Sequence, residues 1–169
     1  MNNIVPVALI ALLLPGCTYA ISPELVKQAD KNLSFEQIES APEQYKGTLV
    51  ILGGTIARAI RTTDGTLIEV AQRSLDSWGR PLRTNRSGGS FLLLHPGSLD
   101  PLLYGPGREI TAAAIVDGSR HKGLEDGDRS WPLLLAKELK LWPEPGRAWS
   151  RPQYLDPLYD PYASPRYSN

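Results

Sequence analysis

Cysteine and histidine are scarce in this chain of 169 residues, which contains one cysteine and two histidines. A lone cysteine cannot form a disulfide within the chain, so a folded domain here depends on its apolar core. Basic and acidic residues number 18 each, which gives a formal net charge of zero. The overall charge therefore offers no general attraction for nucleic acid, and we do not expect nucleic acid as a partner.

The N-terminal apolar run, residues 4–14, is too short to cross a membrane as a helix, which takes about 20 residues. Its length matches the apolar region of a secretory signal, about 7–15 residues. The run ends in Leu14-Pro15-Gly16-Cys17, and the chain then becomes polar. This layout is typical of a bacterial lipoprotein, in which residues 1–16 are removed and Cys17 carries covalent lipid.

An alternative for the same segment is a buried N-terminal strand followed by a structural cysteine, because a free cysteine packs as a small apolar residue. We favour lipidation of Cys17 and expect no other cofactor. Several acyl chains hold a protein on a membrane almost permanently. Thr18 stands where aspartate usually signals retention in the inner membrane, which favours the outer membrane of a Gram-negative cell.

The segment after the cysteine, residues 17–33, is predicted to be a tether that holds the domain clear of the lipid headgroups, with one helical turn behind Pro23. The domain itself is expected over residues 34–142. It begins with the capping box Ser34-Phe35-Glu36-Gln37, which predicts a short helix over residues 35–40. A second short helix is expected between Pro42 and Gly47.

The middle of the chain has the pattern of β-strands separated by glycine and proline. Asp64-Gly65 is a strong hairpin signal, and Gly53-Gly54 predicts a bend within the first strand. We expect a mainly β fold, a small five-stranded OB-like closed barrel, with a β-sandwich as the alternative. The predicted strands are residues 48–60, 67–71, 90–94, 108–118 and 131–142.

The last segment, residues 143–169, contains six prolines and four tyrosines. This composition predicts a disordered or extended tail. Its Tyr-Asp-Pro pieces suggest a docking motif, but a solvated terminal tail is the preferred interpretation.

Catalytic and metal-binding patterns are weak. The chain has neither a Gly-x-Ser-x-Gly nucleophile elbow nor a phosphate-binding loop of the Walker type. His95, Asp100, His121 and Asp126 can be drawn as a metal site, but their spacing matches no ligand pattern. We therefore predict no catalytic residue, no metal and no enzymatic activity.

Two long loops, residues 72–89 and 95–107, offer a binding surface because they combine aromatic and guanidinium groups, which suit an anionic glycan or a peptide carboxylate. In the alternative interpretation the tryptophan packs under its loop and the arginines pair with Asp76, Asp100 or Glu109. Clustered free arginines would favour a periplasm-facing binding module, and arginines saturated by carboxylates would favour a structural role. The candidate residues are Trp78, Arg80, Arg83, Arg86, Tyr104 and Arg108.

Several motifs follow one another in order between Cys17 and Trp142. Besides the cysteine motif they are Pro42-Glu43-Gln44-Tyr45-Lys46-Gly47, Leu52-Gly53-Gly54-Thr55-Ile56, Gly65-Thr66-Leu67-Ile68-Glu69-Val70, Leu75-Asp76 with Gly79-Arg80-Pro81, Leu99-Asp100-Pro101, Gly107-Arg108-Glu109-Ile110-Thr111 and Leu141-Trp142. With these motifs the chain resembles the Slp family of starvation-inducible outer-membrane lipoproteins.

The resemblance implies a lipid-anchored envelope protein, associated with stress or stationary growth, and no known reaction or ligand. We accordingly expect a structural or interaction role in the outer membrane. The expected partners are outer-membrane lipid and other envelope proteins or glycan.

Overall fold

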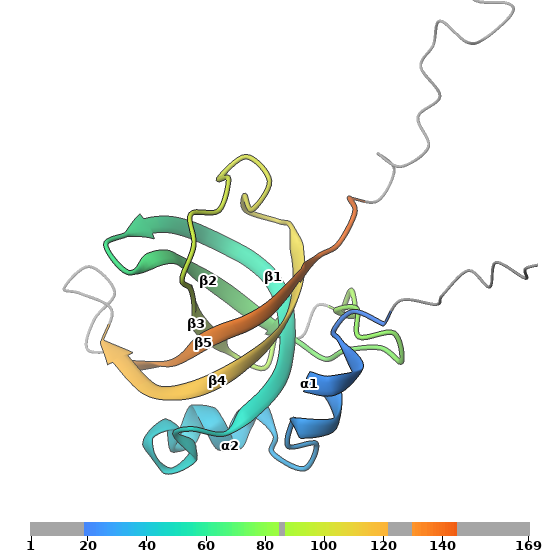
Figure 1. Cartoon of the computed structure of the whole chain (residues 1–169), viewed down its shortest axis with the longest axis vertical. Helices are drawn as coiled ribbons and strands as arrows, with labels where there is room; N and C mark the ends of the chain where they lie inside the picture. Colours follow the sequence, from blue (N-terminus) through green and yellow to red (C-terminus); the bar gives the residue numbers. More distant parts are fainter. Residues whose placement is uncertain (1–18, 85–86, 122–129, 145–169) are drawn as a thin grey trace, which may run out of the picture.

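The computed structural model describes residues 19–84, 87–121 and 130–144, and within them five strands close into a barrel (Figure 1). The order around the barrel is β1-β2-β3-β5-β4, with β3 and β5 parallel and the other neighbours antiparallel. The predicted mainly β, OB-like closed barrel is confirmed. The strands are β1 Leu49–Thr62, β2 Gly65–Arg73, β3 Ser90–His95, β4 Glu109–His121 and β5 Ser130–Leu141.

Strand β1 pairs with both of its neighbours over the same stretch, residues 53–55. A Cβ atom added at Gly54 would overlap the Ala71 carbonyl oxygen, and one at Gly53 would lie 2.7 Å from the Ile110 carbonyl oxygen. The irregularity of the β1–β2 ladder lies between Ile56 and Arg58. The glycines thus admit two neighbouring backbones, and the bulge lies after the pair, at residue 57.

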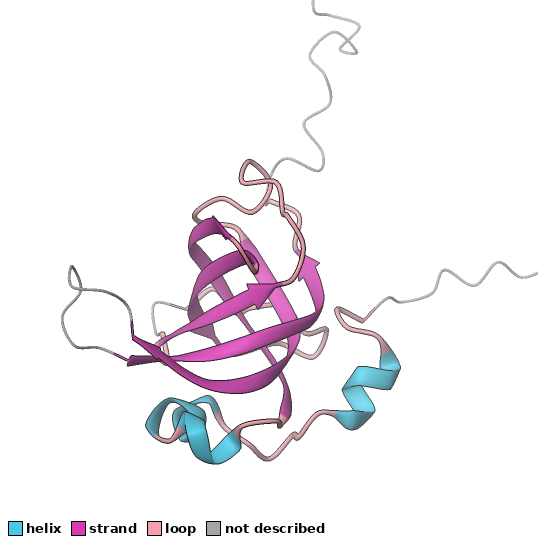
Figure 2. Ribbon diagram, turned by 60° about the vertical axis from the view of Figure 1, so that its left-hand side comes forward, coloured by secondary structure: helices cyan, strands magenta, loops and turns pink. Residues whose placement is uncertain are grey.

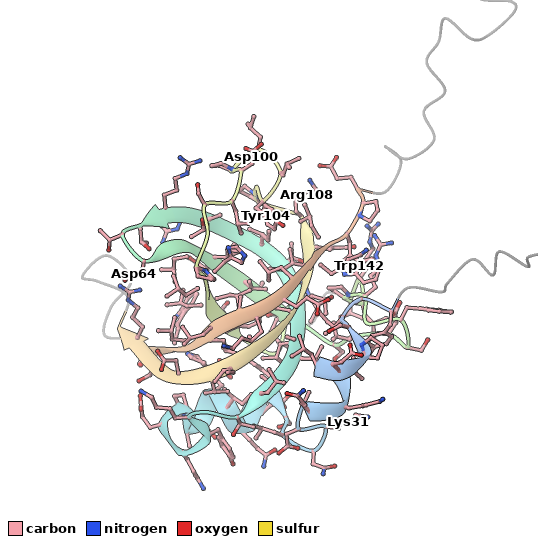
Figure 3. All side chains as sticks on the ribbon, viewed as in Figure 1. Lys31, Asp64, Asp100, Tyr104, Arg108 and Trp142 are labelled. Carbon is pink, nitrogen blue, oxygen red and sulfur yellow. The ribbon has the colours of Figure 1, made fainter. Side chains whose placement is uncertain are left out.

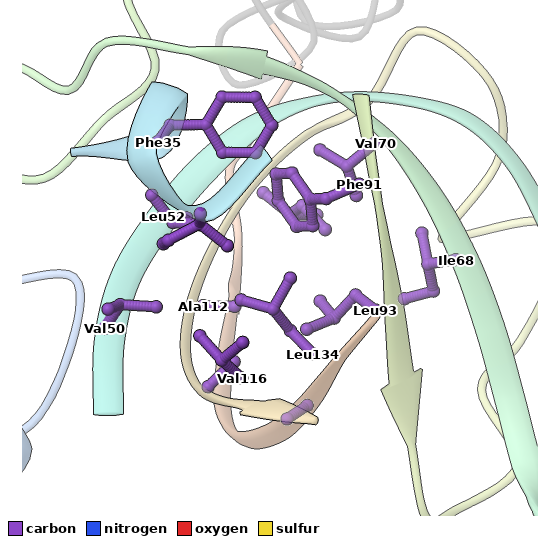
Figure 4. Packing of buried hydrophobic residues seen from close by; sticks show 14 of the residues in the cluster. Phe35, Val50, Leu52, Ile68, Val70, Phe91, Leu93, Ala112, Val116 and Leu134 are labelled. Carbon is purple, nitrogen blue, oxygen red and sulfur yellow. The ribbon is translucent and has the colours of Figure 1, made fainter. Parts of the chain in front are cut away.

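The barrel interior is filled by alternate side chains of all five strands, as period-two alternation requires (Figure 4). Helix α2, Phe35–Ser40, adds Phe35 and Ile38 to this core, and the Phe35 ring lies 5.9 Å from the Phe91 ring. The predicted capping box is present: the Ser34 hydroxyl accepts from the Gln37 amide and the Gln37 side chain accepts from the Ser34 amide. A single 3₁₀ turn, η1 Pro42–Tyr45, connects α2 to β1.

The segment before α2 packs on the outer wall of the barrel, over β1 and β4 (Figure 2). Ala20 and Ile21 are buried against Ala113, and helix α1, Pro23–Gln28, continues this cover. The Ser22 amide donates to the Glu138 carboxylate at 3.0 Å. Residues 19–33 therefore do not stand off from the domain as the expected tether does, because their apolar side chains cover a sheet face that alternation leaves outside the barrel.

Four predicted features lie outside the described residues: Cys17 with the signal, Arg86, Asp126, and the tail from residue 145. Pro143 and Glu144, where the predicted tail begins, are described and adjoin the end of β5. Across the described ranges, none of the helices has the length and apolar character that crossing a membrane takes.

The close approach at Gly54 makes a direct test of barrel closure. Replacement Gly54→Ala forces β1 and β2 apart, and we expect it to lower the free energy of unfolding by about 2–3 kcal/mol. The control is Gly47→Ala, because a Cβ there has open space and only its φ of +88° opposes it, at a cost of about 1 kcal/mol. Urea denaturation followed by circular dichroism measures both, and equal losses would contradict the assigned role of Gly54.

Candidate functional site

Three of the motif segments, residues 75–81, 107–111 and 141–142, meet on the outer wall of the barrel. The first forms a loop after β2 that is closed by a bridge between Leu75 and Pro81. The second leads into β4, and the third is the end of β5. Figure 3 shows Trp142 on this side of the molecule, away from the β1–β2 turn at Asp64. The cluster thus joins residues that are more than 60 positions apart in sequence. An example is the hydrogen bond that Arg80 donates to the Pro143 carbonyl.

The Glu109 carboxylate holds two arginines of the loop. Arg80 donates from Nε and Nη2 to Glu109 Oε2 at 2.9 and 2.8 Å, and Arg83 donates from Nε to Oε1 at 2.7 Å. The Glu109 side chain is 12% exposed. Charge-assisted bonds of this length in a half-buried place are among the stronger polar contacts of a protein. We call these three side chains the Glu109 fork.

The pKa of Glu109 reflects two opposing effects. Partial burial raises the pKa of the carboxyl, and the hydrogen bonds and charges of Arg83 and Arg80 lower it by more, so the pKa lies below its ordinary value of 4.5. A carboxyl with a depressed pKa contributes stability that is fully present above its unfolded-state pKa. This contribution is lost as the pH falls through the folded-state pKa.

The Thr111 hydroxyl joins the loop to the end of β5. It donates to the Gly79 carbonyl at 2.6 Å and accepts from the Trp142 indole Nε1 at 2.9 Å. Thr111 is fully buried although it faces outward on β4. Arg80 adds a cation–π contact, with its Cζ 5.4 Å from the Trp142 ring centre. We call the Gly79, Thr111 and Trp142 contacts the threonine relay.

Asp76 shapes the tip of the loop. Its side-chain oxygen accepts from the backbone amides of Trp78 and Arg80, both at 2.8 Å. Gly79 has a φ of +82°, which glycine adopts without strain. The tip therefore turns tightly enough to leave the Trp78 side chain 55% exposed, and the predicted packing of Trp78 under its loop does not occur.

The other candidate residues lie beside the second long loop. Arg108 donates to the Leu103 and Trp142 carbonyls at 2.8 and 3.1 Å, and its Nε is 3.7 Å from the Glu144 carboxylate. Tyr104 packs against the core of the barrel. Figure 3 shows both between Trp142 and Asp100. The structure thus brings Trp78, Arg80 and Arg83 together on one loop and places Arg108 and Tyr104 on the neighbouring one.

A shallow open cleft borders the Glu109 fork, between β1, the end of β2 and the loop. Two guanidinium groups line it, and both already donate to the protein: Arg83 to Glu109 and Arg73 to the Thr84 carbonyl. An anionic ligand in this cleft would have to displace those acceptors. The arrangement favours the interpretation in which these arginines are paired with acceptors of the protein itself.

The residues that can be drawn as a metal site do not gather within the described ranges. His95 Nδ1 is occupied by its own turn, where it accepts from the Gly97 amide at 3.0 Å. The side chain of His121 and the whole of Asp126 are outside the description. In the described part of the chain, no three His, Cys, Asp or Glu residues are grouped as a metal ion requires.

Sequence reasoning overlooked the threonine relay. Thr111 and Trp142 stand in two of the motifs, but nothing in their local pattern shows that the Thr111 hydroxyl bonds the Gly79 carbonyl and the Trp142 indole. The signal that was present is the unusual run of small residues after Thr111, Ala112-Ala113-Ala114, which indicates a strand crowded on both faces.

Two buried threonines allow a matched test of the relay. Thr111→Val leaves the Gly79 carbonyl and the Trp142 indole without their partner, and we expect a loss of about 1–3 kcal/mol of stability. Hydrogen exchange followed by mass spectrometry should accelerate in residues 75–81. The control Thr66→Val removes a hydroxyl that bonds Gly97 and Leu99, and should accelerate the other loop instead. The same exchange pattern in both variants would refute the assignment.

The Glu109 fork is tested by its pH dependence. Glu109→Gln keeps the shape and removes the charge, so the free energy of unfolding at neutral pH should fall by about 1.5–3 kcal/mol. As the pH falls below about 4.5 the wild type loses this contribution, and the two stability curves converge. Chemical denaturation at a series of pH values measures this, with Glu24→Gln on exposed α1 as the control. Parallel curves for wild type and Glu109→Gln would contradict it.

Known proteins resemble the chain over most of its length. It is 26% identical to the Escherichia coli (strain K12) "Outer membrane protein Slp", over 87% of this chain and 88% of that protein. It is 24% identical to the "Uncharacterized lipoprotein YeaY" of the same organism, over 88% of this chain and 77% of that one. A mitochondrial single-stranded DNA binding protein of S. cerevisiae, Rim1, aligns with 57% of this chain and 95% of its own, at a TM-score of 0.33 and 11% identity.

The family comparison covers both the motifs and the tail. The family described as "Outer membrane lipoprotein Slp family" matches residues 14–168, which include Cys17, the loop and the relay. The chain therefore belongs to the Slp family of outer membrane lipoproteins.

Proposed function

We propose that this outer membrane lipoprotein supports the integrity of the envelope through contacts of its folded barrel, without catalysis, and that Cys17 carries the lipid. The observation that carries the structural role is the Glu109 fork. Arg80 and Arg83, the cations that would recognise an anionic ligand, are already bonded to a carboxylate of the same chain.

A binding module for an anionic glycan or peptide is the weaker alternative. It would need guanidinium groups free to make bidentate bonds with the ligand. Arg80, Arg83, Arg73 and Arg108 all donate to acceptors of the protein. Displacing these bonds would cost about as much as the new bonds would return.

Lipidation of Cys17 is supported by the sequence on both sides of it. An apolar run of signal length precedes Leu14-Pro15-Gly16-Cys17, and a polar chain follows. The family match begins at residue 14, within this motif. With the lipid in place, the proposed partners are outer-membrane lipid first, and envelope proteins or glycan second. A role in stress or stationary growth is part of the proposal and rests on the family resemblance.

The test uses a Gram-negative host from which the gene for the chain is deleted. In stationary phase we expect the deletion strain to admit more of an apolar dye than its parent. Wild-type chain should restore the barrier and Cys17→Ser should not, because an unanchored domain is diluted into the surrounding compartment. Intact mass and membrane fractionation of both forms should show an acyl-sized increment and outer-membrane location for wild type alone.

The variant Glu24→Gln, altered on exposed α1, serves as a control and should restore the barrier as wild type does. Unmodified Cys17 in the wild-type protein would refute the anchor. Full restoration by a soluble, expressed Cys17→Ser chain would refute the need for membrane attachment, and an unchanged barrier in the deletion strain would refute the structural role.

A further inference from the structure

The described part of the chain begins at Tyr19, two residues after Cys17, the residue that we propose carries the lipid. Ala20 is 5% exposed, and its amide donates to the Trp78 carbonyl at 3.3 Å. The Ala20 side chain also lies against Gly79, where an added Cβ would be 3.0 Å from it. Ala20 is thus fixed to the loop that carries the exposed tryptophan.

Covalent geometry sets how far the barrel can stand from the membrane. Consecutive Cα atoms are about 3.8 Å apart, so Cys17 and Ala20 are separated by at most about 11 Å. The headgroup layer of one leaflet is roughly 5–8 Å thick, the difference between the full bilayer and its hydrocarbon core. A lipid on Cys17 therefore holds the neighbourhood of Ala20 within a few ångströms of the headgroups.

The surface that surrounds Ala20 carries two exposed aromatic side chains. Trp78 is 55% exposed and Tyr19 is 38% exposed. The Tyr19 ring lies beside Gly79, since a Cβ at Gly79 would be 3.5 Å from its ring carbon. Tryptophan and tyrosine are enriched at membrane interfaces, where an apolar ring with one polar group suits a layer that is partly apolar and partly wet. We call Tyr19, Ala20 and Trp78 the anchor face.

The backbone at Trp78 is held in place. Asp76 bonds the amide of Trp78 itself, and the threonine relay ties the next residue, Gly79, to the barrel wall. The Trp78 carbonyl is bonded to Ala20. A loop backbone held this way loses little conformational freedom when its tryptophan meets a surface, which favours contact.

We propose that the anchor face lies against the phospholipid surface that holds the Cys17 lipid, with the Trp78 ring in the headgroup layer. This rests on the proposed function, because it requires the lipid on Cys17. The barrel then has a defined orientation: the β1–β2 turn at Asp64, on the opposite side of the molecule from Trp142 (Figure 3), points away from the membrane.

The contact is apolar in origin. Arg80 and Arg83, on the same loop as Trp78, share the single Glu109 carboxylate, so the fork keeps one net positive charge, and the chain as a whole has none. A single net charge adds little attraction to anionic headgroups, so the contact should largely withstand salt.

The experiment uses the full lipidated protein in vesicles of phosphatidylethanolamine and phosphatidylglycerol whose acyl chains are brominated near the carboxyl end. Bromine quenches only tryptophans that reach the interface. We expect quenching in the wild type, in low and high salt alike, and the loss of most of it in Trp78→Phe. Trp78 is exposed, so this variant should fold, which circular dichroism checks.

The matched control is Trp131→Phe, because Trp131 lies near the start of β5, at the opposite end of that strand from Trp142. It should keep the wild-type quenching. Flotation of the same samples separates the proposed lipid anchor from the proposed contact of the anchor face. If the protein does not float with the vesicles, both the anchor and the contact are refuted. If the protein floats, two results refute the membrane contact of the anchor face alone: no quenching in the wild type, or unchanged quenching in Trp78→Phe.

Discussion

The Thr111 hydroxyl lies on the outer wall of the barrel with no access to water, between the Gly79 carbonyl and the Trp142 indole. The hydroxyl would lose one of its two hydrogen bonds if either neighbour moved, and an unpaired buried polar group is costly. The position of the 75–81 loop follows from this requirement. So does the position of the N-terminal segment, since Ala20 is bonded to the same loop.

Strand β4 is covered on both faces by this arrangement. Ala112 and Ala114 point into the barrel, and Thr111 and Ala113 point outward beneath the loop and the N-terminal segment. Larger side chains in this run would leave no room for the covering backbone. Small residues in this run are thus needed for the N-terminal segment to pack on β4. The segment that follows the membrane anchor is therefore packed as part of the barrel domain.

The sequence predicted the features that depend on local patterns. Apolar runs between glycine and proline segments predict the five strands, and the Ser34 capping box and the Asp64-Gly65 turn are recognisable because their partners are a few residues away. Local sequence patterns do not predict contacts between segments that are distant in the chain. Glu109 was one of three carboxylates considered for the arginines, and only the fold shows that Asp76 is already used by its own loop. The role of Gly53-Gly54 likewise depends on two neighbours that the local pattern does not reveal.

Closure of the barrel depends on its last strand. β5 pairs with β3 on one side and with β4 on the other, and among the described strands it alone joins those two. Until β5 is in place, both neighbours have free edges, which invite pairing with other chains. The edges of β3 and β4 therefore stay open until the chain is complete to residue 141, the end of β5. Closure of the barrel, and with it protection from edge-to-edge pairing, depends on the strand that comes last in the sequence.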